Sequence, residues 1–247
     1  ILLILDEGSD ANLINFIRFA RELKKDNCNI ILQCGEQAHA LMENQPWIDS
    51  VISPDMFPEH DYYIYVGSLM NALKLNPNNV PQDFPYIELV RENIDIIKKN
   101  KLNIGLVLES DRDSSAHDDE SIDDKYFDKL FSITHNVISL DKYIDNKNLT
   151  SLYNHKYDYS SLDELSKIIV KLDLVITVDH MIAHLAGALN VDTFLMVPCV
   201  PNWRWEISHR NTTPWYKSVK IFRQDVPDDW TSVIKKVKEE LDEFNNG

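Results

Sequence analysis

Glycine is scarce in this sequence, with six glycines among 247 residues. Neither a GxGxxG fingerprint nor a GxxxxGK[ST] loop occurs. Both motifs are glycine-rich turns that let the backbone approach a phosphate closely. Their absence excludes the usual dinucleotide and P-loop sites. A phosphorylated ligand would instead need a helix N-terminus or a well-placed cationic side chain.

Cysteine is also rare, and long apolar runs are absent. Cys28, Cys34 and Cys199 lack metal-ligand spacing, and their odd number argues against a disulfide framework. We therefore expect a reducing, cytoplasmic setting. No run of about 18 apolar residues is present, so no transmembrane segment is expected, and no signal peptide is visible.

Positive charge is in deficit, and the formal net charge is −15. A field of this sign repels nucleic acid and anionic lipid, so neither is an expected partner. An anionic ligand would have to be bound by a local feature such as backbone amides or a single arginine.

What the sequence does contain is a regular alternation of two patterns. Short β-branched runs predict strands at 1–5, 28–33, 50–53, 61–67, 103–109, 136–140, 173–178, 193–198 and 219–223. Helical spacing of apolar residues predicts helices at 11–25, 36–44, 86–100, 123–132, 161–171, 180–189 and 229–245. One of these opens on an S-x-x-E capping box, Ser161 and Glu164. The alternation predicts an α/β protein with two Rossmann-like lobes of parallel sheet and a cleft between them.

Ligands of parallel sheets bind at the carboxyl ends of the strands. That rule selects four segments for closer inspection. They are residues 6–12, 109–121, 179–184 and 198–205.

The segment DLVITVDHMIAHLAGAL, 173–189, joins a strand to a helix. Asp179 is expected to cap the helix, and the H-x-x-x-H spacing of His180 and His184 places both on one helical face. A metal site would need a third ligand, whereas an anion site needs only free amides and a donor such as His180. We favour the anion site, then a purely structural role, and the metal site last; His184 can equally be a core residue.

The segment 197–224 places aromatic and arginine side chains after a strand. Trp203, Trp205 and Trp215 lie there with Arg204 and Arg210. Such residues can stack on a base or sugar and pair with phosphate. The alternative, that Trp205 and Trp215 only cover the sheet edge, has about equal weight.

These motifs occur in an order that resembles a known family. Residues 173–224 are similar to the C-terminal half of heptosyltransferase-like glycosyltransferases, namely glycosyltransferase family nine and its relatives fused to tetratricopeptide repeats. Their pattern is D-L-V-I-S-V-D-T-x-x-A-H-L-A-G-A-L, followed by D-W-R-W, S-P-W-Y and F-R-Q. The stretches ILLILDEGSDANLINFIRFARELKK and NIGLVLESDRDSSAHDDESI resemble the family more weakly.

The resemblance implies a GT-B fold, α/β with two Rossmann-like domains facing each other across a cleft. Residues 1–100 would form the acceptor domain and 101–228 the nucleotide-sugar donor domain. Residues 229–247 would form a helix that returns toward the first domain. The implied partners are a nucleotide-sugar donor and a glycan or protein acceptor, with no cofactor and no metal. A tetratricopeptide-repeat region upstream in a longer chain is also implied.

Carried over residue by residue, the resemblance assigns donor binding to eight positions: Asp179, His180, Met181, His184, Arg204, Trp203, His117 and Ser121. His180 replaces a family threonine. Glu120 stands where the family has a phosphate-binding arginine, and Arg112 can compensate for that loss.

The position of the family's general base is occupied by Asn12, which cannot accept a proton near neutral pH. Asp10 and Glu7 lie close by and can substitute for it, although both can also be ordinary loop carboxylates. The resemblance nevertheless implies an inverting, metal-independent glycosyltransferase. The alternative is a catalytically degenerate protein of the same fold that binds a nucleotide, a sugar or another protein. A metal-dependent hydrolase is a third, weaker possibility.

Overall fold

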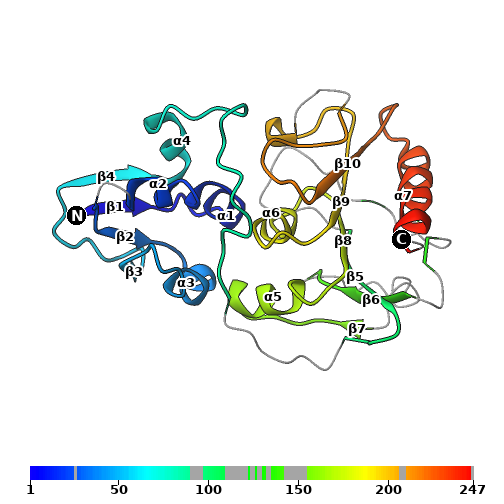
Figure 1. Cartoon of the computed structure of the whole chain (residues 1–247), viewed down its shortest axis with the longest axis horizontal. Coiled ribbons are helices and arrows are strands. Elements are labelled where there is room, and N and C mark those ends of the chain that lie inside the picture. Colours follow the sequence, from blue (N-terminus) through cyan, green and yellow to red (C-terminus); the bar gives the residue numbers. More distant parts are fainter. Residues whose placement is uncertain are drawn as a thin grey trace.

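The computed structural model describes residues 1–24, 27–89, 97–108, 122, 126, 130–131, 135–141, 155–205 and 210–245. Its strands form two separate parallel sheets with helices around them (Figure 1). The predicted α/β class is therefore confirmed. In the described part of the chain, no helix is both long and apolar enough to span a bilayer.

The first sheet has the strand order β3-β2-β1-β4, and every pairing in it is parallel. Its strands are β1 (Leu2–Leu5), β2 (Ile30–Gln33), β3 (Ser50–Ile52) and β4 (Tyr62–Tyr65). The helices of this part are α1 (Asp10–Ile17), α2 (Ala20–Lys24), α3 (Glu36–Glu43) and α4 (Leu69–Ala72), with a 3-10 turn, η1 (Val66–Ser68). The chain direction across the sheet reverses between β1 and β4, which makes that position a topological switch point.

The second sheet has the order β10-β9-β8-β5-β6-β7, again with only parallel pairings. Its strands are β5 (Leu102–Val107), β6 (His135–Ser139), β7 (His155–Lys156), β8 (Leu174–Thr177), β9 (Thr193–Val197) and β10 (Val219–Arg223). Its described helices are α5 (Leu162–Ile169), α6 (Met181–Ala188), the 3-10 turn η5 (Trp203–Trp205) and α7 (Trp230–Phe244). Here the switch point lies between β5 and β8.

Successive side chains of β8 point to opposite faces of the second sheet, and each face packs in a different hydrophobic core. Val175 packs in the core that also contains α1, α5 and α6. Leu174 and Ile176 pack in the other core, with Val233 and Leu241 of α7. This alternation is the period-two pattern of a strand covered on both faces.

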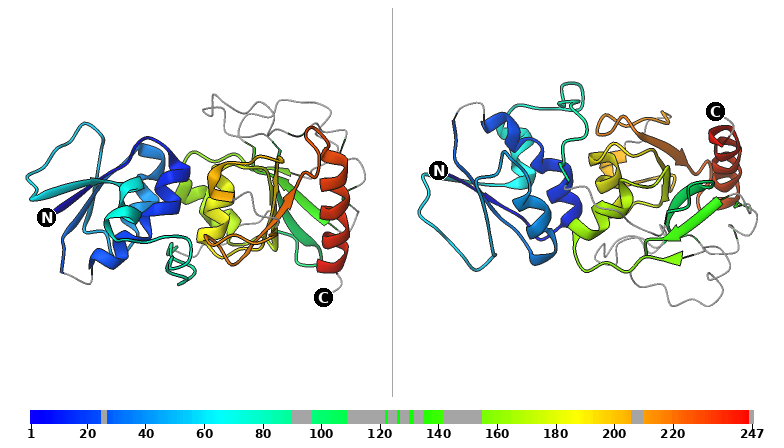
Figure 2. Two further views of the ribbon diagram at one scale, coloured as in Figure 1. Left: turned by 90° about the horizontal axis from the view of Figure 1, so that it is seen from above. Right: turned by 60° about the horizontal axis from the view of Figure 1, so that its bottom comes forward.

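The segment expected to return toward the first domain forms α7, which contacts β10. In all three views α7 lies at the end of the molecule farthest from the first sheet (Figures 1 and 2).

The predicted helix at 86–100 is wrong at both described ends, because neither 86–89 nor 97–100 is helical. The backbone of this segment bonds to other elements instead of to itself. The backbone amide of Tyr86 donates to the Ala188 carbonyl at 3.1 Å, and the side-chain hydroxyl of Tyr86 donates to Ile14 O at 2.9 Å. Gln45 accepts from the Glu88 amide at 2.9 Å. These contacts anchor the connection between the two sheets.

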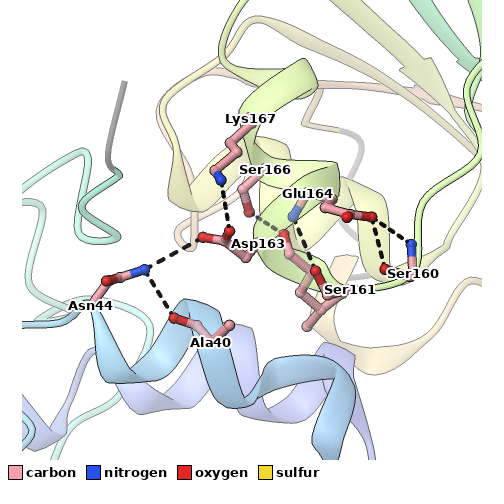
Figure 3. A network of polar contacts seen from close by, with 9 residues as sticks. Ala40, Asn44, Ser160, Ser161, Asp163, Glu164, Ser166 and Lys167 are labelled. Atoms are coloured by element: carbon pink, nitrogen blue, oxygen red, sulfur yellow. Dashed lines mark hydrogen bonds and ion pairs between the residues drawn. The ribbon is translucent and has the colours of Figure 1, made fainter. Parts of the chain in front are cut away.

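The two halves meet where α1 packs on α6 and α3 packs on α5, a region we call the junction (Figure 2). Figure 3 shows its α3–α5 side, where Asn44 donates to Asp163 at 3.5 Å. The predicted N-cap is confirmed there, because Ser161 Oγ accepts from the Glu164 amide at 3.2 Å. The Glu164 carboxylate accepts from Ser160 N at 2.8 Å, one residue before the N-cap amide that a capping box would use. The start of α5 is thus held in register beside α3.

Candidate functional site

The β8–α6 turn begins the site on the second sheet. The N-cap of α6 is His180, whose Nδ1 accepts from the Ile182 amide at 3.1 Å. The prediction that Asp179 caps this helix is therefore wrong. The chain stays extended for one residue more than expected, so the imidazole takes the capping position. Nε2 is then the donor nitrogen of His180, and Met181, the first residue of the helix, is buried.

Arg204 reaches across the junction from η5. Its Nη2 donates to Asn12 Oδ1 at the start of α1, and its Nη1 donates to Asn202 Oδ1 at 2.9 Å. The guanidinium lies 4.8 Å from the centroid of the Trp203 ring and 5.8 Å from that of Phe16. Arg204 therefore connects the second sheet to the position expected for a general base.

The electrostatics of Arg204 leave it able to bind a further anion. Burial lowers the pKa of its guanidinium, and the nearby Asp179 carboxylate opposes that effect. Its Nε is buried without a hydrogen-bond partner among the described residues. A cation with an unsatisfied donor at the end of β8 is suited to binding phosphate or carboxylate.

The carboxyl end of β1 carries three carboxylates in residues 6–10, which we call the acidic turn. Ser9 caps α1 by accepting from the Asn12 amide at 3.4 Å, which places Asp10 in the first helical turn. Glu7 is exposed and lies over Gly67, where an added Cβ would come within 2.7 Å of Glu7 Oε2. The acidic turn therefore sits at the β1/β4 switch point.

Asp6 is a residue that the sequence analysis did not single out, although it is the first residue after β1. Burial, followed by the charge of Asp10, raises the pKa of its carboxyl to about 6. Asp6 Oδ1 is buried with no hydrogen-bond partner in the described part of the chain. A carboxylate with a raised pKa is a recognisable candidate for acid–base chemistry.

The raised pKa of Asp6 makes a stability prediction. The folded protein binds this proton more tightly than the unfolded chain does. The free energy of unfolding therefore falls as the pH rises from about 4 to about 6 and Asp6 ionises. Asp6→Asn should therefore stabilise the protein at pH 7.5 by about 1–2 kcal/mol, after discounting for solvent screening, and change little at pH 4. Urea titrations of both proteins at the two pH values measure this difference. A gain of equal size at both values would refute the assignment.

His184 lies in the core of the junction. It is 1% exposed, its Nδ1 is 2.8 Å from the Tyr216 hydroxyl, and its ring stacks on Trp205 with centroids 4.9 Å apart. Burial, then the charges of Arg204 and Arg18, hold its pKa well below the ordinary value. The structure thus places His184 behind the site, while His180 lies at its surface.

The tryptophans of 203–216 also differ in whether they are exposed at the site or buried behind it. Trp203 is 57% exposed and stacks on Phe16 with the rings 7° from parallel. Trp205 and Trp215 are each 1% exposed, and Trp215 Nε1 donates to the Arg204 carbonyl at 2.7 Å. Only Trp203 is available to a ligand, whereas Trp205 and Trp215 support the backbone that carries Arg204.

Several predicted positions lie outside the described residues, namely Arg112, His117, Glu120 and Ser121. No group of three or more His, Cys, Asp or Glu residues in the described ranges is placed to hold a metal ion.

Arg18 was also missed by the sequence analysis. The signal for it was an arginine inside the apolar helix pattern LINFIRFA.

Two parallel sheets, with their switch points brought to one junction by α1 and α6, define a GT-B architecture. Among the solved structures that it resembles are heptosyltransferases and a family 9 glycosyl transferase. Escherichia coli ADP-heptose LPS heptosyltransferase II aligns over 98% of both chains, with a TM-score of 0.67 and 10% identity. The glycosyl transferase family 9 protein of Veillonella parvula covers 98% of this chain and 96% of its own, with a TM-score of 0.69 and 11% identity.

A third solved structure, E. coli heptosyltransferase WaaC with ADP-2-deoxy-2-fluoro heptose, covers 98% of this chain and 99% of its own, with a TM-score of 0.66 and 9% identity. No family model matches the sequence, and no curated protein matches it either. At such low identities the likeness is one of fold, and it confirms the predicted heptosyltransferase-like GT-B fold.

Proposed function

We propose that this chain is a glycosyltransferase that moves a sugar from a nucleoside-diphosphate sugar to a hydroxyl group of a glycan or protein acceptor. The observation that carries the proposal is Arg204, a largely buried cation with an unsatisfied Nε beside the start of α6. Its position fits a diphosphate at the end of β8. Among the similar solved structures, one is of WaaC with ADP and another of TibC in complex with ADP-D-β-D-heptose.

The donor would be bound without a metal. Its diphosphate would accept hydrogen bonds from Arg204, from His180 Nε2 and from the helix start, whose partial positive charge favours an anion. Trp203, exposed beside Arg204, would cover the base or sugar. The same groups would stabilise the charge that develops on the diphosphate as it leaves.

The reaction would invert the anomeric carbon. A carboxylate of the acidic turn would accept the proton of the acceptor hydroxyl. The hydroxyl oxygen would then bond to the anomeric carbon, as the bond between this carbon and the phosphate oxygen breaks. Asn12 cannot accept the proton, so the base would be Asp6, Glu7 or Asp10. A pKa near 6 suits Asp6 to this task at neutral pH.

A second function is favoured by one observation, the hydrogen bond from Arg204 to Asn12. The side-chain amide of Asn12 stands at the position expected for the general base, and Arg204 is hydrogen-bonded to it. This arrangement fits a degenerate protein that binds a nucleotide sugar without transferring it. Asn12→Asp would restore the carboxylate. If the wild-type protein is inactive, hydrolysis or transfer that appears only in this variant would establish the degenerate function.

The experiment has two stages, and both use the full chain. Calorimetry with ADP, GDP and UDP first asks whether the donor site binds, and a panel of nucleotide sugars then asks whether sugar is released or transferred. Binding with turnover supports the enzyme, and binding without turnover supports the degenerate protein. Absence of binding to every nucleotide at millimolar concentration would reject both.

A further inference from the structure

A pocket lies away from the candidate site, at the opposite end of α1. It has a volume of about 370 Å³ and lies between α2, the turn after α3 and the connection at 80–88. That volume is within the range of small-molecule pockets, roughly 300–1,000 Å³. Arg18, the C-cap of α1, is one of its lining residues. Asn12 lies six residues earlier in α1, so the helix separates the pocket from the candidate site.

Arg18 is an unusual lining residue because it is a buried cation. It is 3% exposed and forms no ion pair with any described carboxylate. Its Nη1 donates to the Trp215 carbonyl at 2.7 Å, and its Nη2 donates to Asn15 Oδ1 at 2.8 Å. The guanidinium also lies 5.0 Å from the centroid of the Tyr86 ring. Among the described residues, its charge is thus stabilised by neutral groups: a carbonyl, an amide and aromatic rings.

Two lining residues have buried donors that lack an acceptor. They are Arg18 Nε and Trp47 Nε1, and each belongs to a side chain more than nine-tenths buried. Buried N–H groups are almost always hydrogen-bonded in folded proteins. Because both residues line the same pocket, an acceptor from outside the described part of the chain, bound there, would satisfy these donors after a small side-chain adjustment.

The other charged residues that line the pocket differ in how deeply they are buried. Arg21 is half-buried and forms no ion pair in the described part of the chain, whereas Lys24 pairs with Asp49. Asp83 and Glu88 are exposed, so water screens their charge at the rim. Glu22, half-buried on the wall, has a partner of its own. The positive charges left uncompensated are therefore the deeper ones.

The remaining lining residues are aromatic side chains and prolines, namely Trp47, Tyr86, Pro46 and Pro81. Aromatic and proline faces of this kind pack on a ring. We infer that this pocket binds a small ring-bearing anion, with its carboxylate or phosphate toward Arg21 and Arg18 and its ring against Trp47. This inference does not depend on the proposed glycosyltransferase function.

The ligand would also act on the connection between the sheets. Trp47 belongs to the first half of the molecule, while Tyr86 is hydrogen-bonded to Ile14 of α1 and to Ala188 of α6. A molecule between Trp47 and Tyr86 would brace this connection, so its binding should raise the melting temperature of the protein.

The test uses calorimetry on the full chain with four probes: phenyl phosphate, benzoate, inorganic phosphate and benzyl alcohol. We expect phenyl phosphate or benzoate to bind with a Kd of about 1 mM, the range for ligands of this size. Inorganic phosphate and benzyl alcohol should bind at least about fivefold more weakly, because each lacks one of the two recognised features. Equal binding of either of these two would overturn the ring-bearing anion, and no binding of any probe would overturn the site.

Two conservative variants locate the binding. Arg21→Gln removes the half-buried charge, and Trp47→Phe keeps a ring but removes the indole donor. Each should weaken binding of the better probe by roughly fivefold to tenfold. Lys235→Gln, which removes a charge from the exposed face of α7, serves as the matched control. Unchanged affinity in both variants, with circular dichroism showing intact folds, would place any binding elsewhere.

Discussion

Replacing Arg204 with methionine should weaken the binding of a nucleoside diphosphate by about 100-fold. Methionine preserves much of the packing against Trp203 and Phe16 but removes the charge and every donor. Two charge-assisted hydrogen bonds, each of about 1.5–3 kcal/mol, account for a loss of this size. The variant also removes the cation that lies near the Asp179 carboxylate, which shifts the charge balance of the site against a diphosphate.

The matched variant is Arg204→Lys, which keeps a cation but loses the planar fork. We expect an intermediate loss, about tenfold, since lysine cannot bond Asn12 and a phosphate in the same geometry. Calorimetry with the tightest of ADP, GDP and UDP measures all three proteins. An affinity of Arg204→Met within about twofold of the wild type would remove Arg204 from the binding site.

Replacing Gly187 with alanine should lower the free energy of unfolding by about 3 kcal/mol. A Cβ at this position would lie 2.4 Å from Tyr216 Cγ, far inside contact distance. The ring cannot move easily, because Tyr216 is 1% exposed and its hydroxyl is bonded to His184. The usual gain in helix propensity from glycine to alanine, about 1 kcal/mol, is too small to offset that clash.

Gly35→Ala is the control for this prediction. An added Cβ at Gly35 meets nothing within 4 Å, and its φ of −65° suits any residue. Its stability should change by less than about 0.5 kcal/mol, because a weaker N-cap and a less flexible unfolded chain offset each other. Urea titration of both variants measures the contrast. Equal stabilities would mean that α6 and Tyr216 are not packed as closely as described.

Local sequence signals were sufficient for most of the fold. The β-branched runs at 1–5 and 173–178 correspond to β1 and β8, because buried parallel strands need continuous apolar residues. The N-cap at Ser161 likewise depends only on neighbours in sequence. The rule that ligands gather at strand ends led to Asp179 and to the acidic turn before any geometry was known.

Contacts between distant residues explain the errors. The segment at 86–89 has helical periodicity, but its backbone amides donate to Gln45 and Ala188, so it does not form a helix. Nothing local shows that His180 rather than Asp179 caps α6. The burial of His184 depends equally on Trp205 and Tyr216, which lie more than twenty residues away. Sequence pattern locates a site, whereas tertiary packing decides which of its side chains face a ligand.

The most direct test of the proposed function is a crystal structure of the full chain with a nucleoside diphosphate. The account predicts the diphosphate at the start of α6, with phosphate oxygens about 3 Å from the Arg204 guanidinium and from His180 Nε2. The acidic turn should face the side of the diphosphate where the sugar would be attached. A nucleotide bound elsewhere, with Arg204 still bonded to Asn12 and no ligand at the end of β8, would contradict it.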